Sequence, residues 1–278
     1  MQKKTLTNIL TVIVLFILAY QFLTGEESSD VTPVLDEIPT VVQTTDELDV
    51  PTDVPSQPKN DAAPAEDAPT ESTAPEENLL AGLEEADGDF DYWVMALSWS
   101  PDYCASNDYS DVQQCSIGKQ LDFVLHGLWP QYDKGYPSYC SNEELSYDLK
   151  ADYAGLYPND NLFDHEWEKH GTCTGLTPQG YLEWNETLKE TLVIPAAFDS
   201  PLEPFRSDAE SLSAEFIAVN PEFTEDSFAA YCSGSGRFLK EIFVCYEKNG
   251  QPTDCSPEAL SKAAKSCGQP DFLVRNTR

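Results

Sequence analysis

All three histidines of the chain lie in two short segments. The segment Phe123–Gln131 contains His126, and the segment His165–Cys173 contains His165 and His170. Imidazole is the side chain that both donates and accepts protons near neutral pH. Two imidazoles on opposite sides of a phosphate could act as base and acid, and a lysine beside them could stabilise developing negative charge. The histidines therefore point to acid–base chemistry.

The second segment brings such groups together if it is helical. Residues four apart share a helix face, so His165 would lie beside Lys169, and Glu166 beside His170. The helix would then gather two imidazoles, one carboxylate and one ammonium group within about a turn and a half.

A zinc site is the main chemical alternative. The zinc-protease pattern H-E-x-x-H needs histidines four apart, whereas His165 and His170 are five apart. A three-histidine zinc site that includes His126 stays open, although the positive charge of Lys169 would repel a cation. Three purely structural histidines are the remaining alternative. We expect no metal and no other cofactor.

The acidic residues are distributed unevenly along the chain. The formal net charge is −33, and residues 26–88 hold 18 acidic side chains, one lysine, eight prolines and no aromatic residue. Such a segment cannot bury enough apolar surface to offset its chain entropy. We predict a disordered linker over residues 26–88 and one folded domain over residues 89–278. The acidity excludes a protein that coats nucleic acid through a basic stripe.

The first 25 residues carry two lysines and then an apolar run. This is the pattern of an export signal, and residues 6–23 are nearly long enough to span a membrane. Residues 1–25 are therefore expected to be a signal peptide or a membrane anchor. Either one predicts an exported protein, periplasmic or extracellular, with membrane association as an open alternative.

The rest of the pattern predicts mixed secondary structure. Strands and helices do not alternate regularly, which favours an α+β fold over a doubly wound parallel sheet. Apolar runs predict strands, capping residues predict helix starts, and Asn-Gly predicts a turn. The expected strands are Tyr92–Trp99, Leu121–Leu125 with His126 directly after it, Phe238–Tyr246 and a return strand near Cys255; the expected helices run from Thr177-Pro178 to Leu192 and from a capping box, Ser207 with Glu210, to Val219.

Eight cysteines, all in the predicted domain, indicate four disulfides. An even count behind an export signal is typical of a disulfide framework. The chain has no C-x-x-C pair, which disfavours a zinc ribbon. Spacing alone leaves all pairings open. The cysteines are Cys104, Cys115, Cys140, Cys173, Cys232, Cys245, Cys255 and Cys267.

Two motifs resemble the active-site segments of the ribonuclease T2 family. H-G-L-W-P begins at His126, and H-E-W-E-K-H-G-T-C begins at His165. Leu97–Pro101 resembles the family's first core strand and the loop after it, and Val244–Cys267 resembles its C-terminal hairpin. The resemblance covers about residues 90–270 and leaves the N-terminal segments outside.

The resemblance implies an α+β fold with an antiparallel central sheet, flanked by helices and stabilised by disulfides. It also implies a metal-independent endoribonuclease that cleaves single-stranded RNA by transesterification. The 2′-hydroxyl would attack, a 2′,3′-cyclic phosphate would form, and 3′-phosphates would be the final products. A catalytically silent RNA-binding member and the three-histidine metal-dependent hydrolase are the alternatives. RNA is the expected partner, and the protein is expected to be a monomer.

The resemblance also assigns roles by motif position. His170 would take the 2′-hydroxyl proton, and His126 would protonate the leaving 5′-oxygen. His165 would bind phosphate, while Glu166 and Lys169 would stabilise the pentacoordinate transition state.

Residues outside the histidine cluster would bind the bases. Trp129 would hold the base on the 5′ side of the cleaved bond, whereas Trp167 is expected in the core. Gln131 stands where some members carry an acidic residue that contacts adenine, so no adenine preference follows. The loop Pro158–Asn161 is expected to line the second base site. The implied disulfides are Cys104–Cys115, Cys140–Cys173, Cys232–Cys267 and Cys245–Cys255.

Overall fold

The structure is a computed structural model that describes residues 80–278. The predicted signal or anchor, residues 1–25, and the linker up to residue 79 lie outside the described residues. Among residues 80–278, none of the helices combines the length and the apolar composition that a membrane span requires.

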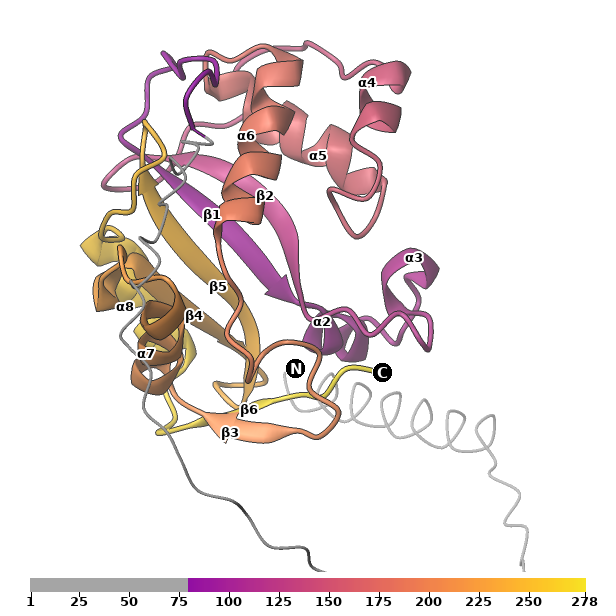
Figure 1. The fold of residues 1–278 in the computed structure, drawn as a ribbon, viewed down its shortest axis with the longest axis vertical. Coiled ribbons are helices and arrows are strands. Elements are labelled where there is room, and N and C mark those ends of the chain that lie inside the picture. The colour runs from indigo at the N-terminus through magenta and orange to yellow at the C-terminus, as the bar shows by residue number, and fades with distance from the viewer. Residues whose placement is uncertain (1–79) are drawn as a thin grey trace, which may run out of the picture. The chain divides into compact units, whose positions relative to one another are not determined.

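A six-stranded sheet forms the centre of the fold (Figure 1). Strand β1 lies between β2 and β5 and pairs antiparallel with both. Strand β6 pairs parallel with β5 at its end, so the sheet is mixed rather than purely antiparallel. The α+β class is confirmed. The strands are β1 Tyr92–Trp99, β2 Phe123–Gln131, β3 Phe205–Ser207, β4 Phe228–Ser233, β5 Phe238–Glu247 and β6 Phe272–Val274.

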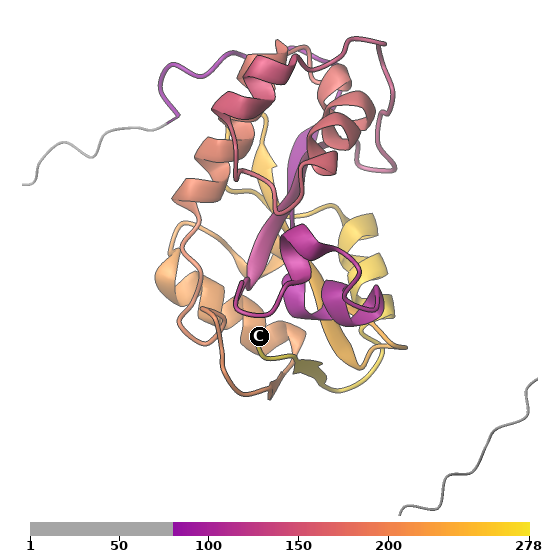
Figure 2. The same cartoon turned by 90° about the vertical axis from the view of Figure 1, so that its right-hand side faces the viewer.

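Helices cover both faces of the sheet. Helices α6 and α7 lie on one face and α8 lies on the other, as the turned view shows (Figure 2). The short helices α2 to α5 stand at the β2 edge of the sheet, with α4 and α5 toward one end and α2 and α3 toward the other (Figure 1). The helices are α2 Ser100–Ser106, α3 Val112–Cys115, α4 Tyr147–Asp152, α5 Asn161–Lys169, α6 Pro178–Thr191, α7 Ala209–Val219 and α8 Pro257–Ser266.

Strand β1 is buried on both faces, which explains its nearly continuous apolar sequence. Trp93, Met95 and Leu97 point into the core under α6 and α7. Tyr92 and Val94 point to the face that carries α8. Burial of each large apolar side chain contributes roughly 1.5–3 kcal/mol to the free energy of folding. The central strand is therefore a rigid base for the residues beside it.

The predicted helix starts agree with the structure at one helix and differ at the other. Thr177 caps α6, because its hydroxyl accepts the Gly180 N–H at 3.1 Å. The capping box at Ser207 is wrong: Asp208 caps α7 by accepting the Ser211 N–H at 2.9 Å. Aspartate and serine are equally good N-cap residues, so the residue types alone could not show whether Ser207 or Asp208 begins the helix.

The strands around the motifs also differ from expectation. The second strand does not end at residue 125 but runs over Phe123–Gln131, so His126 lies within it. The return strand near Cys255 is wrong as well: only an isolated bridge, Tyr246 with Pro252, follows the turn. The four disulfides are the pairs that the resemblance implied, Cys104–Cys115, Cys140–Cys173, Cys232–Cys267 and Cys245–Cys255.

Residues 80–88, which composition assigned to the linker, contact the domain. The Trp184 indole donates a hydrogen bond to the Glu84 carbonyl at 2.8 Å, and the Thr177 hydroxyl donates to the Glu84 carboxylate at 2.6 Å. Ala86 is buried, and Leu83 is partly buried against the core. These few apolar side chains dock the segment despite its charge.

Candidate active site

A β-bulge in β2 aims the side chain of His126. Ala96 of β1 pairs with Gly127 and Leu97 pairs with Leu125, so His126 is the extra residue. A bulge shifts the alternation of a strand by one residue. Leu125 and Leu128 can therefore both enter the core, while His126 lies on the opposite face.

Gly127 lets the helix α5 approach this bulge. A Cβ atom at Gly127 would lie 1.9 Å from Oε2 of Glu166 and 2.5 Å from Nε1 of Trp129. No larger residue fits without moving both groups. The glycine of the first motif therefore allows the close contact between strand and helix.

The second motif forms the helix α5 as expected, but its last histidine lies beyond the helix. Trp167 and Glu166 are buried, and the Trp167 indole donates to the Glu143 carbonyl at 2.8 Å. The expected core position of Trp167 is confirmed. His170 is the C-cap residue, with φ −117° and ψ −51°. It turns inward, whereas the His165 side chain stays 48% exposed.

Glu166 is a fully buried carboxylate at the centre of the site. Its Oε2 accepts a hydrogen bond from the Trp129 indole at 2.6 Å. Its Oε1 lies 3.8 Å from Nε2 of His126 and 3.9 Å from Nε2 of His165, and has no hydrogen-bond partner among the described residues. Burial raises the pKa of Glu166 to about 7, against the opposing effects of His126 and Trp129.

His126 is held from the side opposite to Glu166. Its Nδ1 lies 3.0 Å from Oε1 of Glu241, and Ser98 donates to the same oxygen at 3.1 Å. Burial lowers the pKa of His126, the hydrogen bond and charge of Glu241 raise it, and the net shift of this pKa is upward. His126 therefore favours the protonated form.

His170 has the opposite electrostatic character. The residue is only 2% exposed, and its ring stacks on Trp129, with centroids 5.1 Å apart and planes 22° apart. Neither ring nitrogen has a hydrogen-bond partner among residues 80–278. Burial, with the positive charge of Lys169 and the other histidines, lowers the pKa of His170 to about 3. This imidazole is neutral at physiological pH.

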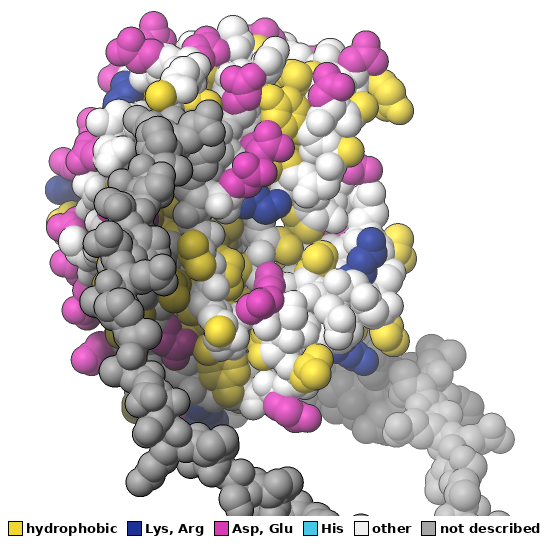
Figure 3. All heavy atoms as spheres, in the orientation of Figure 1, with side chains coloured by type: hydrophobic (Ala, Val, Ile, Leu, Met, Phe, Trp, Pro, Cys, Tyr) yellow, Lys and Arg dark blue, Asp and Glu magenta, His cyan; other side chains and the backbone are white. Residues whose placement is uncertain are grey.

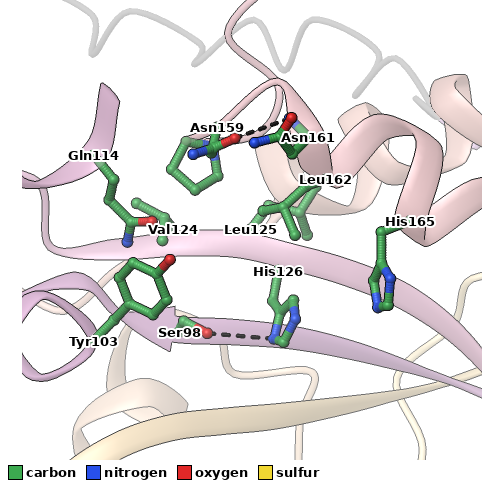
Figure 4. Close-up of a pocket in the computed structure, with 11 residues that line it drawn as sticks. Ser98, Tyr103, Gln114, Val124, Leu125, His126, Asn159, Asn161, Leu162 and His165 are labelled. Carbon is green, nitrogen blue, oxygen red and sulfur yellow. Dashed lines mark hydrogen bonds between the residues drawn. The ribbon is translucent and has the colours of Figure 1, made fainter. Parts of the chain in front are cut away.

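Two cavities flank these residues, one on each side. The first, of about 350 Å³, is lined by His126, His165, Ser98 and the loop residues Pro158, Asn159 and Asn161. Figure 4 shows His126 from the strand and His165 from the helix beside each other at one end of this cavity. The second, of about 280 Å³, is lined by His170, Lys169, Trp129, Gln131 and Tyr136. Two imidazoles, His126 and His165, thus face the first cavity, and one, His170, faces the second.

The structure brings together all the side chains that the motifs singled out. His126, His165, Glu166 and Trp129 are in direct contact, and His170 stacks on Trp129. Two further groups, Glu241 and Ser98, were missed. A signal existed at Glu241, because it is an acidic residue inside the apolar run of β5. Nothing in the sequence linked it to His126.

No group of three or more His, Cys, Asp or Glu side chains within residues 80–278 is arranged to hold a metal ion. The three histidines are separated by Trp129 and Glu166 instead of converging on one point. The residues present therefore do not fit the three-histidine zinc site.

The raised pKa of Glu166 predicts that glutamine at this position stabilises the protein at high pH. In the folded state the carboxyl holds its proton up to about pH 7, whereas the unfolded state loses it from its ordinary value of 4.5. Folding stability therefore falls as pH rises between these values, and Glu166→Gln removes the loss. We expect the variant to gain about 3 kcal/mol relative to the native chain between pH 4.5 and pH 8.

Urea unfolding at both pH values measures this gain. Glu168→Gln on the exposed face of the same helix is the matched control, and should show no comparable change with pH. A difference between Glu166→Gln and the native chain that is the same at both pH values would contradict the interpretation.

Comparison with known proteins shows the same fold and family-level sequence similarity. Residues 90–255 match the model of the Ribonuclease T2 family. A ribonuclease of Aeromonas hydrophila is 40% identical over 69% of this chain and 88% of its own length, and a probable ribonuclease of Haemophilus influenzae is 29% identical over 62% and 63%. A crystal structure of a ribonuclease MC1 mutant with 5′-UMP superposes with a TM-score of 0.51 at 18% identity, over 60% of this chain and 93% of its own.

Proposed function

We propose, since the chain belongs to the ribonuclease T2 family and is an endoribonuclease, that it cleaves single-stranded RNA without a metal ion. The 2′-hydroxyl would attack the adjacent phosphate, the 5′-oxygen of the next nucleotide would leave, and a 2′,3′-cyclic phosphate would form. Slower hydrolysis of this ring would end in a 3′-phosphate.

The observation that carries the proposal is that His126 and His170 line different cavities, His126 the first and His170 the second. A scissile phosphate between the two cavities would put one nucleotide in each. The nucleotide beside His170 would supply the 2′-hydroxyl, and the nucleotide beside His126 would depart. A neutral imidazole is needed where a proton is taken and a protonated one where it is given. The two pKa values are shifted in those directions.

His170 is the proposed base and His126 the proposed acid. Two titratable groups whose environments separate their pKa values are the usual arrangement for acid–base catalysis at one pH. His165 is half-exposed, and its Nε2 faces the same carboxylate oxygen as His126. A phosphate at this point would lie within reach of both rings, which supports phosphate binding by His165.

Glu166 and Lys169 are proposed to stabilise the transition state. Phosphoryl oxygens gain negative charge as the 2′-oxygen attacks, and an ionised carboxylate would repel them. Below about pH 7 the Glu166 carboxyl keeps its proton, so its free oxygen can donate a hydrogen bond instead. Lys169 lines the same cavity as His170 and supplies a positive charge.

The two cavities are proposed to bind one base each. Trp129, Gln131 and Tyr136 would hold the base on the 5′ side, with the aromatic rings as stacking surfaces. The loop Pro158–Asn161 and Leu162 would hold the base on the 3′ side. Bases must be unstacked to enter such cavities, which favours single-stranded RNA.

The four disulfides bear on the location of the protein. Four disulfides form and persist in an oxidising compartment, so we propose an exported protein, periplasmic or extracellular. Residues 1–25 would direct export as a signal or anchor, residues 26–79 would be the acidic linker, and the catalytic domain would extend from about Leu80 to residue 278.

The products made from ApG in the presence of EDTA test the function. Adenosine 2′,3′-cyclic phosphate and guanosine support the proposal. Cleavage that requires added zinc would favour the metal-dependent alternative, and binding of ApG without cleavage would favour a silent RNA-binding protein.

The acidity of the surface predicts an unusual response to salt. Acidic side chains outnumber basic ones on the face shown in Figure 3, and residues 89–278 carry 31 acidic and 13 basic residues. Long-range attraction of RNA is therefore weak. Added salt screens the repulsion between RNA and the acidic surface as well as the attraction between RNA and nearby basic groups, so the two effects on kcat/KM offset each other. We expect kcat/KM for a short single-stranded RNA to change less than about threefold between 50 mM and 200 mM NaCl. A fall of 100-fold or more would contradict this prediction.

A further inference from the structure

We infer that Glu241 is a positioning residue for the general acid: its buried carboxylate fixes the His126 ring so that Nδ1 carries a proton and Nε2 faces the phosphate. The inference rests on the proposed function and names a residue that neither motif contains. Glu241 lies 115 positions beyond His126 in the sequence.

The contacts of Glu241 determine which nitrogen is free. An ionised carboxylate only accepts hydrogen bonds. The Nδ1 of His126, 3.0 Å from Oε1 of Glu241, must therefore be the donor. The other nitrogen, Nε2, is left to face Oε1 of Glu166 at 3.8 Å. The side chain of His126 is 33% exposed, so Nε2 can reach a ligand in the first cavity.

The backbone holds Glu241 firmly in this position. Ser98 and Glu241 are direct partners in the antiparallel pairing of β1 with β5, and the Ser98 hydroxyl donates to the same carboxylate oxygen. Ile242 and Val244 bury the other face of β5 in the core. The side chain of Glu241 is 6% exposed, and a buried carboxylate without partners would cost several kcal/mol. Pairing with His126 removes that cost.

The charges around His126 favour the same assignment. Strand β5 contributes Glu241 and Lys240, and the helix α5 with its cap contributes Glu166, His165 and His170. Within this set, the contact with Glu241 is the strongest influence that favours the protonated ring. A general acid must hold its proton until the leaving oxygen needs it, and Glu241 meets that need.

Substitution of Glu241 in the full-length oxidised protein tests the inference. Glu241→Gln keeps the shape and one acceptor but removes the charge. We expect kcat/KM for ApG to fall about tenfold, and about 100-fold for Glu241→Ala, the range found for carboxylates that orient metal-bound histidines. The pKa of His126 should fall, so the decline of kcat/KM at high pH should begin at a lower pH in Glu241→Gln. Glu247→Gln, an exposed position on the same strand, is the control and should leave the rate and pH profile unchanged.

A substrate with a good leaving group separates the role in acid catalysis from a structural one. The 4-nitrophenolate of uridine 3′-(4-nitrophenyl phosphate) leaves without a proton, so this ester does not need a general acid. Glu241→Gln and His126→Ala should both cleave it at near the native rate while being defective on ApG. Urea unfolding at pH 6 verifies that the variants are folded.

Three results would overturn an assignment, and they can be told apart. If Glu241→Gln slows the ester as much as ApG, Glu241 acts on the fold and not through the acid. If it slows neither substrate and leaves the pH profile unmoved while His126→Ala is defective on ApG alone, Glu241 has no positioning role. If His126→Ala slows both substrates equally, His126 is not the acid and the proposed function itself fails.

Discussion

Replacing His170 with phenylalanine should lower kcat/KM for ApG by about 10²- to 10⁴-fold, the usual range for loss of a general base. The ring of His170 is buried against Trp129, and a benzene ring fills nearly the same volume. The variant should therefore remain folded, and its urea midpoint at pH 6 should not fall. The neutral imidazole would be lost without a change in the cavity around it.

His165→Phe is the matched comparison for His170→Phe. His165 faces the proposed phosphate position but transfers no proton in the proposed reaction. The fall in kcat/KM for His165→Phe should therefore be smaller than for His170→Phe and should appear mainly as a higher KM. A loss of less than about tenfold for His170→Phe, in a variant shown to be folded, would remove His170 from the role of base.

Removing the Cys140–Cys173 disulfide should destabilise the protein by roughly 3–4 kcal/mol, as the chain-entropy relation predicts for a loop of this length. The bond closes a separation of 33 residues. It also joins the turn after His170 to the loop that carries Tyr136, and both residues line the second cavity. Cys140→Ser with Cys173→Ser should therefore reduce kcat/KM for ApG even where the protein is fully folded.

The Cys232–Cys267 disulfide offers a comparison, because it closes a similar separation of 35 residues and joins Tyr231 and α8, which line the second cavity, without adjoining a histidine of the site. Its removal should cost a similar free energy of unfolding and reduce the activity of the folded fraction less than removal of Cys140–Cys173. Urea unfolding gives the stabilities, and kcat/KM measured well below the midpoint gives the activities. Equal losses of activity in the two double variants would contradict a specific role of Cys140–Cys173 in the site.

The sequence predicted the elements that depend on local pattern. Apolar runs predicted β1, and the helical spacing of the second motif predicted α5, in which His165 and Lys169 lie four residues apart. His126 was predicted to follow a strand but lies within β2. The strand was predicted too short because a bulge breaks the alternation of side chains by which strands are recognised. Leu125 and Leu128 are three residues apart, which resembles a helix or a strand end. Only the pairing with β1 shows that they belong to one strand.

Groups brought together over long sequence separations were beyond prediction from the sequence. Glu241 meets His126 because β1 lies between their two strands, and no local pattern contains that order. The burial of His170 also depends on tertiary structure, since it requires Trp129 and Tyr136 to cover the ring. Family resemblance supplied the residues of the site, whereas their protonation states follow from burial and neighbours in the fold.

The most direct test of metal-independent transesterification is cleavage of ApG by the full-length oxidised protein in EDTA and oxygen-18 water, followed by mass spectrometry. If the 2′-hydroxyl attacks, the first product is adenosine 2′,3′-cyclic phosphate without solvent oxygen. The later 3′-phosphate then carries one solvent oxygen. We predict this order, and its loss in His170→Phe. A first product that already carries solvent oxygen, with no cyclic phosphate before it, would mean that water attacks the phosphate directly and would contradict the account.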